Sequence, residues 1–273
     1  MTISNYHESI AVKKPRFSVK DMPSWSITLI SVATLMIVWE LCGPWINPLF
    51  GSYPSQIIRS FLDMMSDGML VRAFVQSIQP FVVGYALAAL AGIPIGLLLG
   101  RYRVFDAAFG IYITAGYATP SIALVPLLMI WFGLGFSVKV VIVFLMAFFP
   151  ICINTTAGVK AVPKTLIEVG TAFCASQTKI MRQIVLPATL PYIMAGLRLA
   201  VGKAVIGMIL AEFLTALSGL GGIIINAANS FRTAEMFVPI ILVMILAVVL
   251  EKLLALLEHV VAPWQREISG DGH

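Results

Sequence analysis

The sequence predicts an all-α integral membrane protein with about six transmembrane helices. Hydrophobic residues make up 59% of the 273 residues and charged residues only 11%, whereas about a quarter of a soluble domain is charged. The mean hydropathy is +0.96. Several apolar runs reach the length of about 20 residues that a helix needs to cross a bilayer. Because such a chain cannot cover its apolar mass with polar residues, lipid must contact much of its surface.

Six stretches are long and apolar enough to span the membrane. We place them at residues 27–46, 77–100, 109–132, 138–158, 191–217 and 236–257, within a transmembrane domain covering 27–257. Residues 1–26 and 258–273 are then cytoplasmic tails. The first run is too long for a signal-peptide core and no cleavage site of small residues follows it, so we expect an uncleaved first helix.

The distribution of basic residues predicts the orientation. With the N-terminus inside, the cytoplasmic segments hold twelve lysines and arginines and the external segments hold four, as the positive-inside rule requires. Both termini should therefore be cytoplasmic. The net charge of +5 is explained by this orientation, because the bases lie in short clusters between apolar runs and form no polar face for nucleic acid.

The segment between the first two spans, residues 51–76, predicts an amphipathic helix at the outer interface. Its apolar residues recur at helical spacing among polar ones, at Ile57, Ile58, Phe61, Leu62, Met64 and Met65. Within the next two spans, Pro94, Pro120 and Pro126 predict kinks. Gly92 and Gly96 are spaced for close approach of another helix.

The longest cytoplasmic connection, residues 160–190, is too polar to span and too regular to be a flexible linker. Its apolar residues predict two short helices, one with Leu166, Ile167, Val169 and Phe173, and one with Ile180, Ile184, Val185 and Leu186. Ala175 and Ser176 lie near the join, and Pro187 and Pro191 separate this elbow from the fifth span. One interpretation is a tether lying on the inner leaflet.

The order of residues in this elbow supports another interpretation. Glu168, Val169 and Gly170 are followed by Cys174 and then by Ile184, Val185, Leu186 and Pro187. This order resembles the cytoplasmic loop of type I ABC importer permeases, with its E-A-A triplet, its glycine four residues on and its I-x-L-P ending. Val169 and Gly170 replace the two alanines, and Cys174 replaces the glycine. If residue 174 is left-handed, cysteine costs about 1 kcal/mol or more; the turn could instead fall at Ala175–Ser176.

The resemblance covers residues 54–263 and is closest to permeases of the nitrate, sulfonate and taurine class. It is carried by five further stretches in the same order as in that class: residues 53–55 (YPS), 92–96 (GIPIG), 119–126 (TPSIALVP), 154–159 (NTTAGV), and 211–213 (AEF) with 219–221 (GLG).

The resemblance implies a coupling helix that sits in a groove of a separate ATPase. The residues it assigns to ATPase coupling are Glu168, Val169, Gly170, Cys174, Ala175, Leu186 and Pro187. It also implies ATP-binding cassette ATPase subunits, an extracytoplasmic solute-binding protein and a second copy of this chain as partners. ATP would be hydrolysed by the partner, and this chain would bind no cofactor. The solute would be a small anion, although related permeases also carry aromatic and vitamin-precursor solutes.

The sequence offers no catalytic or metal-binding constellation. The segment from Gly196 to Lys203 has the wrong glycine spacing and lacks the Ser or Thr of a phosphate-binding loop. We find no paired acids, no HExxH motif and no nucleophile elbow, and the three histidines are scattered. A transport subunit is therefore favoured over a membrane enzyme.

Three ionisable residues lie within the fifth span: Arg198, Lys203 and Glu212. Lys203 and Glu212 are candidate pathway residues, because a charge in a span is costly unless it faces protein or water. They lie nine residues and about 180° apart, so they cannot pair on one helix. Lys203 could instead bind a backbone carbonyl or stabilise a dimer, and Glu212 could cap the outer end of the span. The alternative function is an ATP-independent carrier or channel that uses both residues.

Overall fold

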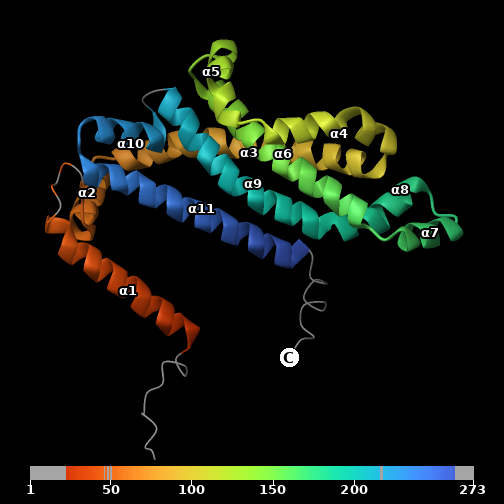
Figure 1. Ribbon diagram of the computed structural model, residues 1–273, viewed down its shortest axis with the longest axis horizontal. Helices are drawn as coiled ribbons and strands as arrows, with labels where there is room; N and C mark the ends of the chain where they lie inside the picture. Colours follow the sequence, from red (N-terminus) through yellow and green to blue (C-terminus); the bar gives the residue numbers. More distant parts are fainter. Residues whose placement is uncertain (1–22, 46, 48, 50, 216–217, 262–273) are drawn as a thin grey trace, which may run out of the picture.

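The computed structural model of the chain describes residues 23–45, 47, 49, 51–215 and 218–261. Residues 1–22 and 262–273, on which most of the two predicted tails fall, lie outside the described residues. The described chain is helical, and the prediction of an all-α membrane protein is confirmed (Figure 1). Five helices are long and apolar enough to span a membrane, or six if one bent pair counts as a single span.

The helices follow one another with short connections. In chain order they are α1 (Ser24–Cys42), the 3-10 turn η2 (Gly43–Trp45), α2 (Pro54–Ser66), α3 (Met69–Arg101), α4 (Arg103–Ala118), α5 (Ser121–Phe132), α6 (Phe136–Ala161), α7 (Lys164–Ala172), α8 (Gln177–Ile180), the π-helical turn η3 (Met181–Val185), α9 (Leu186–Leu214), α10 (Gly219–Asn229) and α11 (Thr233–Val261).

The predicted third span, residues 109–132, is a broken pair of helices. Helices α4 and α5 meet at an angle of 99°, whereas the sequence predicted one kinked span. Thr119 takes an extended conformation with ψ of 130°, as the steric demand of the following Pro120 favours. Since Pro120 also lacks the amide hydrogen that would continue α4, the helix ends at Ala118 and a new one starts.

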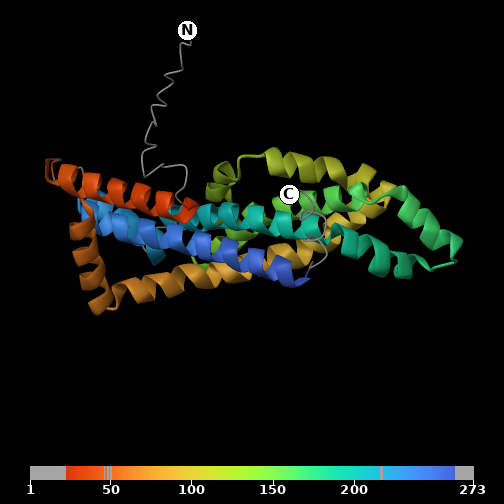
Figure 2. The same ribbon diagram turned by 90° about the horizontal axis from the view of Figure 1, so that it is seen from below.

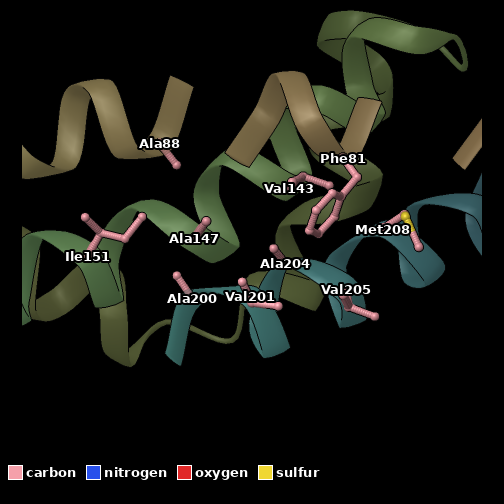
Figure 3. Packing of buried hydrophobic residues seen from close by; sticks show 10 residues of the cluster. All are labelled: Phe81, Ala88, Val143, Ala147, Ile151, Ala200, Val201, Ala204, Val205 and Met208. Atoms are coloured by element: carbon pink, nitrogen blue, oxygen red, sulfur yellow. The ribbon is translucent and has the colours of Figure 1, made fainter. Parts of the chain in front are cut away.

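Helices α3, α6 and α9 form the centre of the molecule, with α6 between the other two. A cluster of buried side chains joins them (Figure 3): Phe81, Ala88, Val143, Ala147, Ile151, Ala200, Val201, Ala204, Val205 and Met208. Glycines line the face of α3 toward α6, as the spacing of Gly92 and Gly96 predicted. A Cβ at Gly96 would lie 2.7 Å from the backbone oxygen of Cys152. Small residues thus allow the close backbone contact by which helices associate in lipid.

The two ends of the long axis carry different elements. Helices α2 and α10 lie at one end and the α7–α8 elbow at the other (Figures 1 and 2). Basic residues gather at the elbow end, on the ends of α3, α4 and α6 and on the elbow itself: Arg101, Arg103, Lys160, Lys164, Lys179 and Arg182. The elbow end therefore matches a cytoplasmic face and the α2–α10 end an external one.

The predicted outer helix exists, but it is shorter than residues 51–76. Helix α2 ends at Ser66, and residues 69–76 begin α3. Ile57 and Met64 are buried in a cluster with α3, α10 and α11, while Ile58 and Leu62 on the other side of α2 are exposed. The amphipathic pattern therefore identified the helix, and the αL conformation of Gly68 ends it.

Helix α1 stands apart from the central helices and is fastened at its outer end. The indole Nε1 of Trp39 donates to the carbonyl of Ser52 at 2.8 Å, and a carboxylate oxygen of Glu40 accepts from the amide of Ser55 at 3.0 Å. Most of its described side chains are exposed. This first span is therefore held by α2 and leaves its length free for lipid or a partner.

Candidate coupling elbow and membrane pathway

The elbow consists of α7, α8 and η3 and is attached firmly to the inner ends of the core helices. Ile180 and Val185 are buried with Val159 and Val162, which lie at the end of α6 and just after it. At the neighbouring helix end, Arg101 donates from Nη2 to the side-chain oxygen of Gln177. The elbow can therefore move little without moving α3 and α6.

The predicted role of Pro187 and Pro191 as a break before the fifth span is wrong. Helix α9 begins at Leu186, so Pro187 lies in its first turn and Pro191 inside it, and η3 joins it without interruption to α8. Because the helical run is continuous, Pro187 leaves one position in it without an amide donor. The wide π turn of η3, which lies shortly before Pro187, shifts the helical register at this point.

The turn between α7 and α8 is centred on Cys174, whose φ is +51°. The amide of Cys174 donates to the carbonyl of Thr171 at 2.9 Å, and the amide of Ala175 to that of Gly170 at 3.0 Å. These two bonds are those of a Schellman motif, in which glycine usually takes the left-handed position. Ser176 then starts α8, with its side chain accepting from the amide of Lys179. The left-handed residue is thus Cys174, and the alternative turn at Ala175–Ser176 is not formed.

We expect Cys174→Gly to raise the free energy of unfolding by about 1 kcal/mol, because it relieves the clash of a Cβ in a left-handed residue. Denaturant unfolding of the detergent-solubilised protein would measure this change. Cys174→Ala is the control, since it removes the thiol and keeps the Cβ. An equal gain from alanine would show that the sulfur, rather than the backbone conformation, causes the strain.

Helix α7 has one face against the protein and one face open. Ile167 is half-buried and Gly170 is buried, where a Cβ would lie 3.0 Å from Ile184. Leu166, Val169 and Phe173 lie on the open face, and Phe173 is 83% exposed. We name these three residues the elbow stripe. Glu168 is also exposed, on the flank of α7 next to Val169, so the elbow presents an apolar surface with a carboxylate beside it, as a protein-binding site does.

The structure divides the predicted coupling residues into two groups. Glu168, Val169 and Cys174 are exposed on α7 or next to it, whereas Gly170, which also belongs to α7, is buried. The remaining three are half-buried: Ala175, Leu186 and Pro187. Sequence reasoning placed Phe173 on a helix but missed it as a contact residue. Its position four residues after Val169 and seven after Leu166, which places all three on one helix face, carried that signal.

Lys203 lies in the middle part of α9, with its ammonium 3.8 Å from the centroid of the Tyr117 ring. Tyr117 lies at the end of α4, just before the break at Pro120. Among the described residues, no carboxylate forms an ion pair with Lys203. The half-buried cation thus rests on an aromatic face, which stabilises it within the membrane and leaves its charge available to an anion.

Glu212, the second predicted pathway residue, is completely buried near the outer end of α9. One carboxylate oxygen accepts from Ser77 at 2.7 Å, and the other accepts from the amide of Gly221 at 2.8 Å. Lys139 lies 3.6 Å away on α6. Sequence reasoning missed Ser77 and Lys139 as partners; a lysine in the first turn of an apolar helix was the available signal.

With this geometry established, the chain can be compared with known proteins. Residues 92–267 match the family described as the binding-protein-dependent transport system inner membrane component. The chain belongs to this family. An ABC transporter permease protein of Methanocaldococcus jannaschii is 33% identical over 260 residues, which is 93% of this chain and 97% of that protein.

Two further comparisons agree with the family. The taurine transport system permease protein of Escherichia coli is 28% identical over 251 residues, covering 89% of this chain and 91% of that protein. The crystal structure of an amino acid ABC transporter with histidines shares the fold, with a TM-score of 0.60 and 17% identity over 73% of this chain and 97% of that one. This permease is therefore the membrane-spanning subunit of an ATP-driven importer and works with ATPase and solute-binding partners.

Proposed function

We propose that two copies of this permease form the solute pathway in a bacterial inner membrane, and that a separate ATPase docks on each elbow. The observation that carries this proposal is the elbow stripe with Glu168, exposed at the basic end of the molecule. ATP is bound and hydrolysed by the docked subunit, and this chain contributes no cofactor. The extracytoplasmic binding protein acts at the opposite end, where α2 and α10 lie.

In this proposal the elbow residues have different roles in coupling. Leu166, Val169 and Phe173 supply apolar area to the ATPase groove, and Glu168 supplies a charge that fixes the orientation of docking. Gly170 and Cys174 set the shape of the elbow, while Leu186 and Pro187 join it to α9. ATP binding closes the ATPase dimer and draws the two elbows together, so the attached spans tilt from inward-open to outward-open.

Exposed apolar side chains in the described structure support the proposal of a second copy of the chain. Helix α4 contains no buried residue, and Ile111 and Tyr112 on it are 71% and 68% exposed. Side chains of this kind need lipid or protein around them. The mass of the purified assembly tests the stoichiometry: we expect two permeases and two ATPases.

We expect Phe173→Asp to reduce ATP-driven uptake at least about tenfold, because it places an unpaired charge in the apolar centre of the ATPase contact. Glu168→Ala should weaken docking more modestly. The measurements are co-purification of the ATPase and solute uptake by proteoliposomes. Thr171→Ala is the control, since the hydroxyl of Thr171 donates to the carbonyl of Ile167 on its own helix and lies away from the stripe.

Two outcomes would contradict the proposal. Full ATPase binding and uptake by Phe173→Asp would show that the elbow stripe is not the docking surface. Uptake by the purified permease alone, without ATP or partners, would favour the alternative of an independent carrier or channel. Insertion into the membrane should be unaffected in all variants, since the altered residues lie outside the spans.

The solute is, in our proposal, a small anion. Relatives are named as permeases for taurine, for aliphatic sulfonates and for nitrate, although others are named for formylaminopyrimidine and riboflavin. The specific observation that favours an anion is Lys203, a cation within a span that pairs with the Tyr117 ring. We place Lys203 in the pathway, where a passing negative charge gains from it.

A further inference from the structure

The first turn of α10 is capped by side chains from two distant helices. The amide of Gly219 donates to the side-chain oxygen of Gln76 at 3.1 Å, that of Leu220 to the hydroxyl of Ser77 at 2.9 Å, and that of Gly221 to Glu212 at 2.8 Å. The first amides of a helix have no partner within it. Here α3 and α9 supply three acceptors, and one of them carries a full negative charge.

The charge of Glu212 is balanced from both sides. The helix N-terminus carries a partial positive charge, and Lys139 on α6 lies 3.6 Å from the carboxylate. Lys139 also donates to the hydroxyl of Ser218 at 2.8 Å, just before α10. Four elements, α3, α6, α9 and α10, are thus joined by one polar network, which is buried at Ser77, Lys139 and Glu212. We name Ser77, Lys139, Glu212 and Gln76 the outer clamp.

The outer clamp fixes the surface at the end of the molecule opposite the elbow. Leu220 and Ile223 of α10 share one buried cluster with Ile57 and Met64 of α2 and with side chains of α3 and α11, so a displacement of α10 disturbs the packing that holds α2. A groove of about 380 Å³ runs between α3 and α10, and Asp67, Arg72, Gln76 and Asn226 are among the residues that line it. Polar groups that could meet another protein therefore lie directly above the clamp.

We propose that Glu212 is a positioning residue that holds α10 in the surface on which the solute-binding protein acts. The inference rests on the proposed orientation, in which the elbow is cytoplasmic and the clamp external. Glu212 makes no contact with solute in this role. Its charge acts through α10, because a neutral side chain there would leave the ammonium of Lys139 without a carboxylate and weaken the cap.

The test compares four variants in reconstituted transporter: Glu212→Gln, Lys139→Met, both together, and the charge exchange Glu212→Lys with Lys139→Glu. Binding-protein-stimulated ATP hydrolysis is titrated with the solute-binding protein. For Glu212→Gln we expect the half-saturating concentration to rise about tenfold or more, as for the loss of a hydrogen bond to a charged group. The maximal rate should change much less. The paired neutral variant should recover part of the loss.

The charge exchange separates a helix cap from a simple ion pair. An ion pair would tolerate the exchange, whereas a lysine at 212 would face the amides of α10, so we expect this variant to be the worst of the four. A charge exchange that restores the wild-type titration would overturn the proposal, as would a Glu212→Gln variant with an unchanged half-saturating concentration.

A second measurement keeps the result interpretable if a variant assembles poorly. Nitroxide labels at Ile58→Cys on α2 and Asn229→Cys on α10, both exposed in the structure, report the separation of these helices in the permease without partners, once the exposed Cys42 and Cys174 are replaced by serine. Glu212→Gln should broaden this distance distribution; an unchanged distribution would overturn the positioning role. A failure of the proposed function would appear in a different measurement, the co-purification of the ATPase, which would then not depend on the elbow stripe.

Discussion

The variant Gly219→Ala should unfold more easily than the wild type by about 3 kcal/mol or more. Gly219 has φ of +83°, and a Cβ placed on it would lie 1.9 Å from a carboxylate oxygen of Glu212. Alanine in this conformation costs about 1–2 kcal/mol, and the displaced carboxylate also loses hydrogen bonds of about 1.5–3 kcal/mol each. Denaturant unfolding in detergent and the amount of protein in the membrane would measure the effect.

Gly202→Ala is the matched control for this prediction. Gly202 lies inside α9, and a Cβ there would meet nothing within 4 Å. Alanine is about 1 kcal/mol better than glycine in a helix interior, so this variant should be neutral or slightly more stable. Equal stability of the two variants would show that the space around Gly219 can rearrange at little cost.

The second large effect is expected from Lys203→Glu, which should reduce uptake of an anionic solute at least about 100-fold. A unit charge contributes about 3 kcal/mol at 5 Å for an effective dielectric constant of 20, and the substitution turns that attraction into repulsion. It also places a negative charge against the face of the Tyr117 ring. Uptake by proteoliposomes containing the assembled transporter would be measured.

Lys203→Arg controls for the loss of packing around this side chain. Arginine keeps the positive charge and stacks on aromatic rings, so uptake should be largely retained. Normal uptake by Lys203→Glu would show that Lys203 does not line the pathway, and the proposed role of the elbow would be unaffected. A loss of uptake that is equal in both variants would indicate a structural requirement for lysine.

The parts of the fold that follow from composition were predictable, whereas the tertiary contacts of polar residues were not. Hydropathy alone places the apolar helices, and helical spacing in residues 57–65 identified α2. The break at Thr119–Pro120 was expected only as a kink, since a proline marks the weak point of a helix but not the angle that packing imposes. The partners of Glu212 lie 135 residues away at Ser77 and on α6 at Lys139. A lysine in an apolar helix was visible in the sequence, but its pairing with Glu212 was not.

The elbow, too, was predictable in its helices but not in its tertiary contacts. Its existence and its two helices followed from residues 160–190, and the departure from glycine at Cys174 pointed to a strained turn. Which residue took the left-handed conformation depended on hydrogen bonds to Gly170 and Thr171, which the sequence leaves undetermined. The π turn before α9 was hidden because Pro187 and Pro191 suggested a break at the same place.

The close glycine-lined contact of α3 with α6 has a consequence for how a push at one membrane face reaches the other. Helix α6 runs without interruption from Phe136 to Ala161, and a Cβ at Gly96 would already collide with its backbone. The two helices therefore cannot slide past each other along this face without a collision. We therefore expect α3 and α6 to tilt together as one unit, so that an inward displacement of their cytoplasmic ends produces an outward displacement of their external ends.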